Sequence, residues 1–225
     1  DGVKALTVGR DTSGLFVALG KRWGELRVVE STTTPLTLAC YKGDVAAISV
    51  LLQEGAGVDQ EDYDGYSPLF VASLKGHVDA ARLLLDAGAA VDKRREGDWS
   101  PFGIACALGH VDVATLLVER GADTAAVNTC SGGTPPLLFA CRARNLGAMQ
   151  LCLEHGADPN WANEEGETVL YDACKNGHVG GARLLLERGA EINQATENGE
   201  TPLFIACQKG YVDAARLLLE KGADV

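Results

Sequence analysis

The sequence lacks any apolar run near the roughly 18 residues that a membrane-spanning helix needs, and its one methionine is Met149. It also lacks the pattern of a secretory leader, because the opening DGVKALTVGR has no basic start that runs into a hydrophobic stretch. We therefore expect no direct membrane insertion. The missing initiator methionine and the final GADV indicate a fragment of a longer protein.

An excess of basic residues is also missing. The formal net charge is −11, and residues 1–30 are almost neutral, with five Lys or Arg against four Asp or Glu. The remaining residues carry 15 bases against 27 acids and so hold the acidity. A protein that neutralises phosphates needs a basic surface, so we exclude nucleic acid as a partner.

The motifs of common enzymes are absent as well. There is no G-x-S-x-G, no H-E-x-x-H and no G-x-x-x-x-G-K, since the GGTPPL stretch lacks the lysine and a preceding strand. No pair of carboxylates stands apart from the repeat described below. We predict no catalytic residues, no metal site and no cofactor.

Cysteine is present, but in a number and density that do not suit a secreted disulfide scaffold. Seven cysteines is an odd count, and such scaffolds are shorter and richer in cysteine. We expect reduced thiols and a cytoplasmic, intracellular location, with the nucleus also compatible.

A motif of about 33 residues occurs six times. Its first half reads TPLTLACYKGD at 34–44, SPLFVASLKGH at 67–77, SPFGIACALGH at 100–110, PPLLFACRARN at 135–145, TVLYDACKNGH at 168–178 and TPLFIACQKGY at 201–211. A second half, such as LLDAGA, follows each copy, and its glycines are separated by 33, 33, 35, 33 and 33 residues. A fixed period of this length is typical of stacked repeat architectures.

Local rules predict two helices in each copy. Ser67 is a suitable N-cap, and Pro at the first helical position costs no hydrogen bond, so a helix should cover 68–75 and end at Gly76. An apolar stripe predicts a second helix over about 78–87, closed by Gly88. The polar, turn-forming residues that follow predict a hairpin-like link.

A unit of two antiparallel helices and a turn that opens T-P-L-x-x-A resembles the ankyrin repeat. The resemblance covers residues 32–225 and implies an α-rich repeat solenoid, in which ankyrin-type helix-turn-helix pairs stack and β-hairpin loops project from one edge. We expect repeats at about 32–61, 62–94, 95–129, 130–162, 163–195 and 196–225. Residues 1–31 do not fit the period; they predict short strands that form a cap or belong to an upstream domain.

Most polar and sulfur side chains have structural explanations. Five cysteines follow the same alanine and predict small apolar spacers of the first helices: Cys40, Cys106, Cys141, Cys174 and Cys207. Cys152 should also lie in the core, whereas Cys130 lies in a loop. His77, His110 and His178 share one position after the first helix, which favours a turn-capping role over metal ligation. Asn160 and Asn193 should bond the local backbone of a turn.

The fourth copy departs from the pattern. Pro135 replaces the usual Thr or Ser, and the TAAVNTCSGG loop before it contains the two extra residues. Arg144 stands where other copies have glycine, a position that favours a left-handed backbone. Either Arg144 accepts that conformation or Asn145 takes up the turn.

The resemblance implies protein binding through the hairpin tips and the concave row of first helices. Most ends of these helices carry a base, which predicts a basic stripe on an acidic body; the candidate residues there are Tyr41, Lys42, Leu74, Lys75, Leu108, Arg142, Arg144, Lys175 and Lys209. These bases either complement the helix dipoles in solvent or form a track for an acidic or phosphorylated segment.

Aromatic residues mark the earlier hairpins: Tyr63, Tyr66, Trp99 and Trp161. Each ring either folds back on its neighbour or contributes to an interface, where Tyr and Trp dominate the binding energy. Our hypothesis is that Tyr66, Trp99 and Trp161, with Lys75 and Leu108 below them, form a contact patch.

These observations predict a non-catalytic module for protein–protein interaction, a scaffold or adaptor. Two alternatives remain: a substrate-targeting or regulatory domain of a larger enzyme, such as a kinase or ubiquitin ligase, and a membrane-skeleton adaptor. Fold alone does not choose between them.

Overall fold

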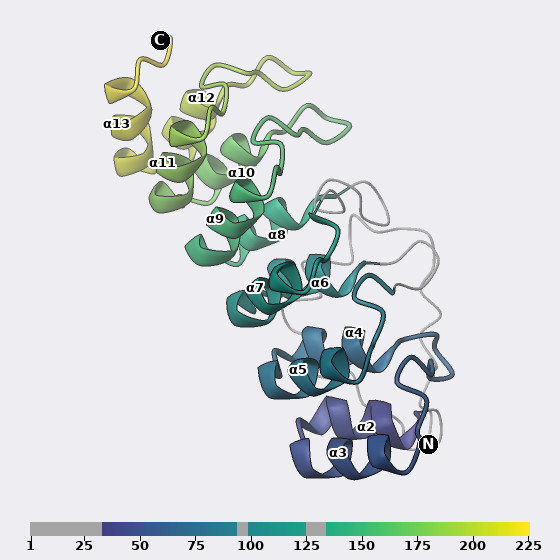
Figure 1. Ribbon diagram of the computed structural model, residues 1–225. Helices are drawn as coiled ribbons and strands as arrows, with labels where there is room; N and C mark the ends of the chain where they lie inside the picture. Colours follow the sequence, from purple (N-terminus) through teal and green to yellow (C-terminus); the bar gives the residue numbers. More distant parts are fainter. Residues whose placement is uncertain (1–32, 94–98, 125–133) are drawn as a thin grey trace.

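The computed structural model describes residues 33–93, 99–124 and 134–225, so the expected N-terminal segment 1–31 and Cys130 lie outside the described residues. Six pairs of helices follow one another in chain order within these ranges (Figure 1). Their bounds are α2 Pro35–Lys42, α3 Val45–Gln53, α4 Pro68–Lys75, α5 Val78–Asp86, α6 Pro101–Leu108, α7 Val111–Glu119, α8 Pro136–Arg142, α9 Leu146–Glu154, α10 Val169–Lys175, α11 Val179–Glu187, α12 Pro202–Lys209 and α13 Val212–Glu220.

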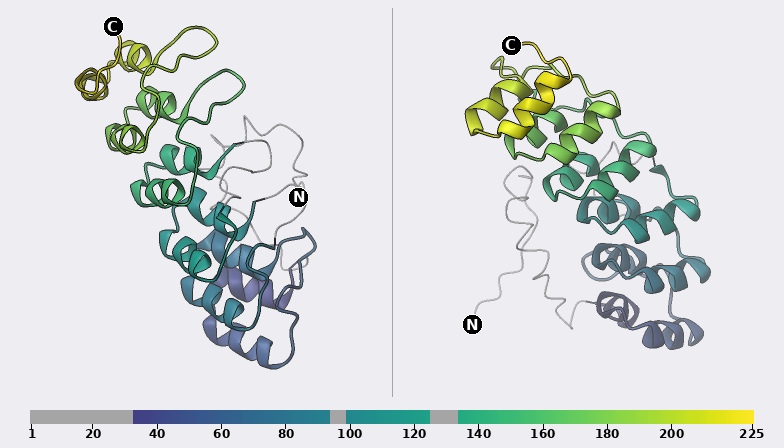
Figure 2. Two further views of the ribbon diagram at one scale, coloured as in Figure 1. Left: turned by 45° about the horizontal axis from the view of Figure 1, so that its top comes forward. Right: turned by 90° about the vertical axis from the view of Figure 1, so that its left-hand side faces the viewer.

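The architecture is an α-rich repeat solenoid, as the sequence predicts. First helices form one row and second helices another, and the connecting loops project from the side of the first helices (Figure 1). Figure 2 shows the same stacking order from two other directions. Each first helix packs against its own second helix and against the first helix of the next pair. The core is therefore a continuous strip along the array.

Side-chain caps fix the start of the first helices. Thr34, Ser67, Ser100, Thr168 and Thr201 each accept the backbone N–H three residues later, at 3.0–3.2 Å. Pro135 occupies the same position before α8 and makes no such bond. The fourth copy thus begins its first helix without the cap that its five counterparts have.

The ends of the first helices require a left-handed residue. Gly76 has φ +73° and closes α4, and glycines do the same after α2, α6 and α12. Arg144 takes this conformation after α8 with φ 57°, the one non-glycine residue with positive φ in the described part of the chain. Asn145 instead keeps φ −90° and caps α9. Arg144 Nη2 donates to the carbonyl of Asn176 at 2.6 Å, which ties the strained turn to the next pair.

The shared histidine position links neighbouring pairs. His77 Nε2 donates to the carbonyl of Tyr41, and His110 Nε2 to that of Leu74, both at 3.2 Å. Asn145 Nδ2 donates to Gly109 in the same way at 3.1 Å. These side chains bond the C-terminal end of the first helix in the preceding repeat. His77 and His110 make no side-chain cap bond to their own second helix, whereas Asn145 also accepts the N–H of Ala148 and so caps α9. The Nε2 atom of His178 is buried without a hydrogen-bond partner, and its ring lies against Gly181.

The hairpins are linked by a second series of bonds. Asp59 accepts the N–H of Ala90, and Asp92 accepts that of Asp123. Asn160 and Asn193 continue the series, accepting the N–H of Glu191 at 2.7 Å and of Asp224 at 3.0 Å. We expected these asparagines to bond the backbone of their own turn. That expectation is wrong for their side-chain oxygens, which accept hydrogen bonds from the following repeat.

Five of the six cysteines in the described residues lie in the core. Cys40, Cys106, Cys141, Cys152 and Cys174 are all buried, and none of them forms a disulfide with another described cysteine. Burial raises the pKa of the Cys40, Cys141 and Cys174 thiols to about 12, so they are poor nucleophiles at neutral pH. Cys207 is exposed because it belongs to the last described pair, which no further pair covers.

Candidate partner-binding surface

The bases at the ends of the first helices do not form the uniform stripe that the sequence predicts. Arg142 on α8 directs Nε and Nη2 to one oxygen of Asp172 on α10, at 3.1 and 2.8 Å. Asn176 donates to the other oxygen at 3.1 Å. The Asp172 side chain is 6% exposed and that of Arg142 is 42% exposed. Asp172 therefore neutralises most of the Arg142 charge within the array.

Lys175 is engaged in a similar way. Its Nζ lies 2.7 Å from Glu167 on the preceding hairpin and 5.7 Å from the centre of the Tyr171 ring. The buried Tyr171 hydroxyl donates to Glu200 on the next hairpin at 2.5 Å, and burial raises the pKa of this tyrosine. Together these contacts join the last hairpins to the row of first helices and neutralise the base.

The first two repeats retain bases that carry no ion pair in the described part of the chain. Lys75 Nζ lies 4.2 Å from the centre of the Tyr41 ring, a cation–π contact that leaves its charge uncompensated. Lys42 is exposed one residue after Tyr41. Leu74 is buried at 7% exposure, and Leu108 is half-buried. Lys209 is a further exposed base at the far end.

The expectation that Trp99 offers a free ring is wrong. Its side chain is 8% exposed and its ring centre lies 4.9 Å from that of Phe139. The ring also lies over Gly103, where an added Cβ would come within 3.6 Å of Trp99 Cε3. Trp99 thus fills the space that a glycine on α6 leaves, and it belongs to the core between the third and fourth pairs.

The other hairpin aromatics divide in the same way. Tyr66 stacks on Phe70 with ring centres 5.0 Å apart and planes 12° apart, and half-buried Trp161 packs against the core. Tyr63 alone extends into solvent, with 90% of its surface exposed. The contact patch that we expected from Tyr66, Trp99 and Trp161 is therefore not a set of free rings.

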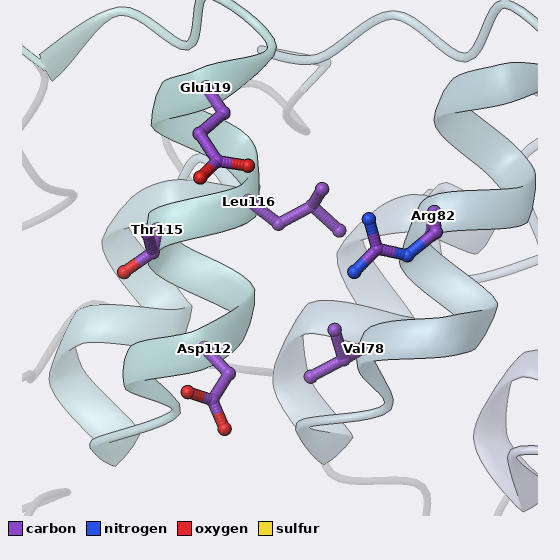
Figure 3. A pocket seen from close by; sticks show the side chains of 6 residues that line it. All are labelled: Val78, Arg82, Asp112, Thr115, Leu116 and Glu119. Carbon is purple, nitrogen blue, oxygen red and sulfur yellow. The ribbon is translucent and has the colours of Figure 1, made fainter.

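Sequence reasoning missed an open groove between the second helices α5 and α7. It has a volume of about 450 Å³ and is lined by Val78, Arg82, Asp112, Thr115, Leu116 and Glu119. Figure 3 shows Arg82 and Leu116 extending between the two helices, with the carboxylates on the α7 side. The sequence contains no signal for it, because Val78 and Leu116 belong to the apolar pattern that recurs in the second helices and that we assigned to packing.

The described residues contain no group of three His, Cys, Asp or Glu side chains that could hold a metal ion. No helix in this part of the chain is both long and apolar enough to cross a membrane. The arrangement offers charged, aromatic and apolar side chains for contact.

Comparison with family models identifies the repeat. The model described as ankyrin repeats, in sets of three copies, matches residues 13–95, 37–128, 90–163 and 137–225. A comparison with curated proteins gives no match.

Solved structures with the same fold come from several sources. An ankyrin repeat domain from Acinetobacter baumannii is 30% identical with a TM-score of 0.74, over 84% of this chain and 98% of that one. The human ASB11 ankyrin repeat domain is 28% identical with a TM-score of 0.74, over 85% of each chain. A chain from the complex of a Bdellovibrio bacteriovorus predatory endopeptidase with its immunity protein is 25% identical with a TM-score of 0.73, over 84% of this chain and 99% of that one.

Proposed function

The chain belongs to the ankyrin repeat family, and on that premise we propose that it is a non-catalytic scaffold or adaptor module that binds another protein. Ankyrin repeat domains generally mediate protein–protein interactions, and one similar structure comes from a complex of an endopeptidase with an immunity protein. Buried, high-pKa cysteines and the lack of a metal-binding group in the described residues support a contact role.

We place the contact surface at the first two repeats. The observation that carries this choice is the pair Lys42 and Lys75 beside the Tyr41 ring, because neither lysine forms an ion pair with a carboxylate of the described residues. Leu108 adds apolar surface and Tyr63 an exposed ring at the hairpin edge. We call Tyr41, Lys42, Tyr63, Lys75 and Leu108 the N-terminal contact surface.

The remaining candidate residues have supporting roles in this proposal. Arg144 and Lys209 are exposed and extend the surface toward the C-terminal end. Arg142, Lys175, Leu74, Tyr66, Trp99 and Trp161 hold the first helices and hairpins in place through the contacts described above. A partner would contact only the exposed parts of these side chains, because they already contact other residues of the array.

The partner that this charge favours is an acidic or phosphorylated segment. An ammonium group binds carboxylate or phosphate through charge-assisted hydrogen bonds. Lys42 and Lys75 belong to successive repeats, and first helices in such stacks lie about 8–10 Å apart. An extended segment rises about 3.3 Å per residue, so acidic side chains spaced three residues apart would match the two lysines.

Peptide binding tests this proposal. A library of acidic, phosphorylated and neutral peptides should give salt-dependent binding by the acidic members, and the double change Lys42→Glu with Lys75→Glu should abolish it. The matched control is Arg82→Glu on the second-helix row, which reverses a charge outside the surface. Unchanged binding by the lysine variant, with an intact helical circular dichroism spectrum, contradicts the proposed surface.

A further inference from the structure

The hairpin between α3 and α4 presents a tyrosine that the fold does not use. Tyr63 is 90% exposed, and within residues 33–93, 99–124 and 134–225 its ring makes no aromatic contact and its hydroxyl no hydrogen bond. The loop projects from the stack of helices (Figure 1). An aromatic ring exposed to water does not contribute the hydrophobic stabilisation that a buried ring provides.

The repeat itself does not require an aromatic residue at this position. Tyr63 lies eight residues after Gly55, and the same step from Gly156 and Gly189 leads to Glu164 and Glu197. Both glutamates are exposed at their hairpins. The apex therefore accepts a negatively charged side chain in two other copies of the same hairpin.

Backbone and neighbouring side chains hold the apex without help from the ring. Asp62 Oδ1 accepts the N–H of Asp64 at 3.0 Å and of Tyr66 at 2.9 Å, and Gly65 N–H bonds to the Asp62 carbonyl. The flanking residues are acidic on both sides, in the order Glu61, Asp62, Tyr63, Asp64. Tyr63 is thus a free phenol, on a turn that does not depend on it, within an anionic segment.

The other four tyrosines of the chain are occupied. Tyr41 lies under Lys75, and Tyr66 stacks on Phe70. Tyr171 is 2% exposed and bonded to Glu200. Tyr211 is 39% exposed, but its ring packs on Gly177, where an added Cβ would come within 2.5 Å of the ring. Tyr63 is therefore the most exposed of the five tyrosines and the one whose ring makes no contact in the described part of the chain.

We propose that Tyr63 is a site of tyrosine phosphorylation by a kinase that accepts acidic substrates. In this step the Tyr63 hydroxyl oxygen attacks the γ-phosphorus of a nucleoside triphosphate. The new O–P bond forms as the bond to the bridging β,γ-oxygen breaks; the phenol proton passes to the kinase's catalytic aspartate, and the diphosphate leaves. The product carries a charge of about −1.5 to −2 at the position where Glu164 and Glu197 carry one.

The consequence for binding rests on the proposed function. The phosphate would lie at the edge of the N-terminal contact surface, in which Lys42 and Lys75 attract an acidic segment. It would repel such a segment, so modification would act as a switch that releases the partner.

Phosphorylation in vitro tests the site independently of any partner. The whole chain is incubated with magnesium, ATP and a tyrosine kinase domain that phosphorylates Glu-Tyr copolymers, and intact and fragment masses are recorded. We expect one phosphate, on Tyr63. Incorporation should fall at least about tenfold in Tyr63→Phe, because the other tyrosines are less exposed and a kinase must first free their rings from the contacts described above. The matched control Tyr66→Phe keeps the stacked ring and should incorporate as the parent does.

Two results would overturn the proposal. One is phosphate on another tyrosine at a rate equal to that of Tyr63. The other is no incorporation into the folded chain, whether or not a synthetic peptide of residues 57–70 is modified. A chain phosphorylated on Tyr63 that binds acidic peptides unchanged contradicts only the switch, whereas loss of the lysine effect contradicts the proposed function.

Discussion

Two glycines that both have a positive φ lie in different surroundings. Gly76 has φ +73° and lies under the next repeat, so an added Cβ would come within 2.5 Å of His110 Nδ1. Gly88 has φ +87° and nothing lies within 4 Å of the corresponding position. The comparison separates the strain of a left-handed backbone from the crowding between repeats.

We predict that Gly76→Ala lowers the free energy of unfolding by about 2–4 kcal/mol, whereas Gly88→Ala lowers it by about 1–2 kcal/mol. Both changes strain the backbone, but only the first displaces His110 and weakens its bond to Leu74. Urea denaturation of the two variants measures the difference. Equal losses of unfolding free energy in the two variants would contradict the prediction, because they would show that displacing the His110 ring does not lower stability.

Single residues also mark the limit of sequence reasoning. Arg144 takes the left-handed conformation that glycine has in most other repeats, whereas the sequence left open whether Arg144 or Asn145 would take up the turn. Trp99 could not be placed in the same way. Its burial depends on the missing side chain of Gly103 and on Phe139 from the next pair, which meet only once the pairs have stacked.

At the scale of helices, a side chain that precedes a second helix hydrogen-bonds to the end of the first helix in the preceding repeat. His110, which precedes α7, donates to Leu74 at the end of α4. Burial, followed by the nearby charges of His77 and Lys75, lowers the pKa of His110 despite this bond, and burial also lowers the pKa of His178. The unfolded chain therefore binds a proton at these sites before the folded chain does. Stability falls as the pH drops below the unfolded value of about 6.5.

We predict that the urea midpoint of the parent chain decreases between pH 7 and pH 5, and that His110→Asn reduces this decrease. Asparagine is the matched replacement because Asn145, at the same position of its repeat, also donates a hydrogen bond to a backbone carbonyl of the preceding repeat, that of Gly109. The variant should keep a hydrogen bond between the repeats but lose the imidazole that binds a proton in this pH range. A midpoint that changes equally with pH in both chains would assign the effect to other groups.

The sequence predicted the helices closely, since a helix is decided by local caps. The expected 68–75 agrees with α4, and the second helix, expected to about 87, ends at Asp86. The hydrogen bonds of Asp59, Asp92, Asn160 and Asn193 were missed. They join residues about 31 apart, and no local rule contains that separation.

Across the whole array, one repeat boundary depends on a charge pair where others use apolar contacts. Asp172 replaces the apolar residue found at Leu38, Val71, Ile104, Phe139 and Ile205, and Arg142 reaches it from the preceding pair. A buried carboxylate is costly without its partner, although replacing both partners by apolar groups is often neutral. The expected basic stripe is interrupted here, because Asp172 in the next repeat neutralises Arg142.

We predict that Arg142→Ala lowers the free energy of unfolding by about 2 kcal/mol, less than for a fully buried pair because Arg142 is partly exposed. The double change Arg142→Ala with Asp172→Ile should recover most of the loss, since isoleucine fills this position in two other repeats. Because stability in such arrays is a sum over neighbouring interfaces, the single variant should also broaden the urea transition. A double variant no more stable than the single one would contradict this account.

The burial of Trp99 gives the array an optical reporter. An indole ring that is 8% exposed and 4.9 Å from a phenyl ring of the next pair emits at shorter wavelength than one in water. Separation of the third and fourth pairs would wet the ring and move its emission to the red. With Trp23 and Trp161 changed to Phe, Trp99 would be the only tryptophan left in the sequence, and its emission would follow the opening of the boundary between the third and fourth pairs without an added label.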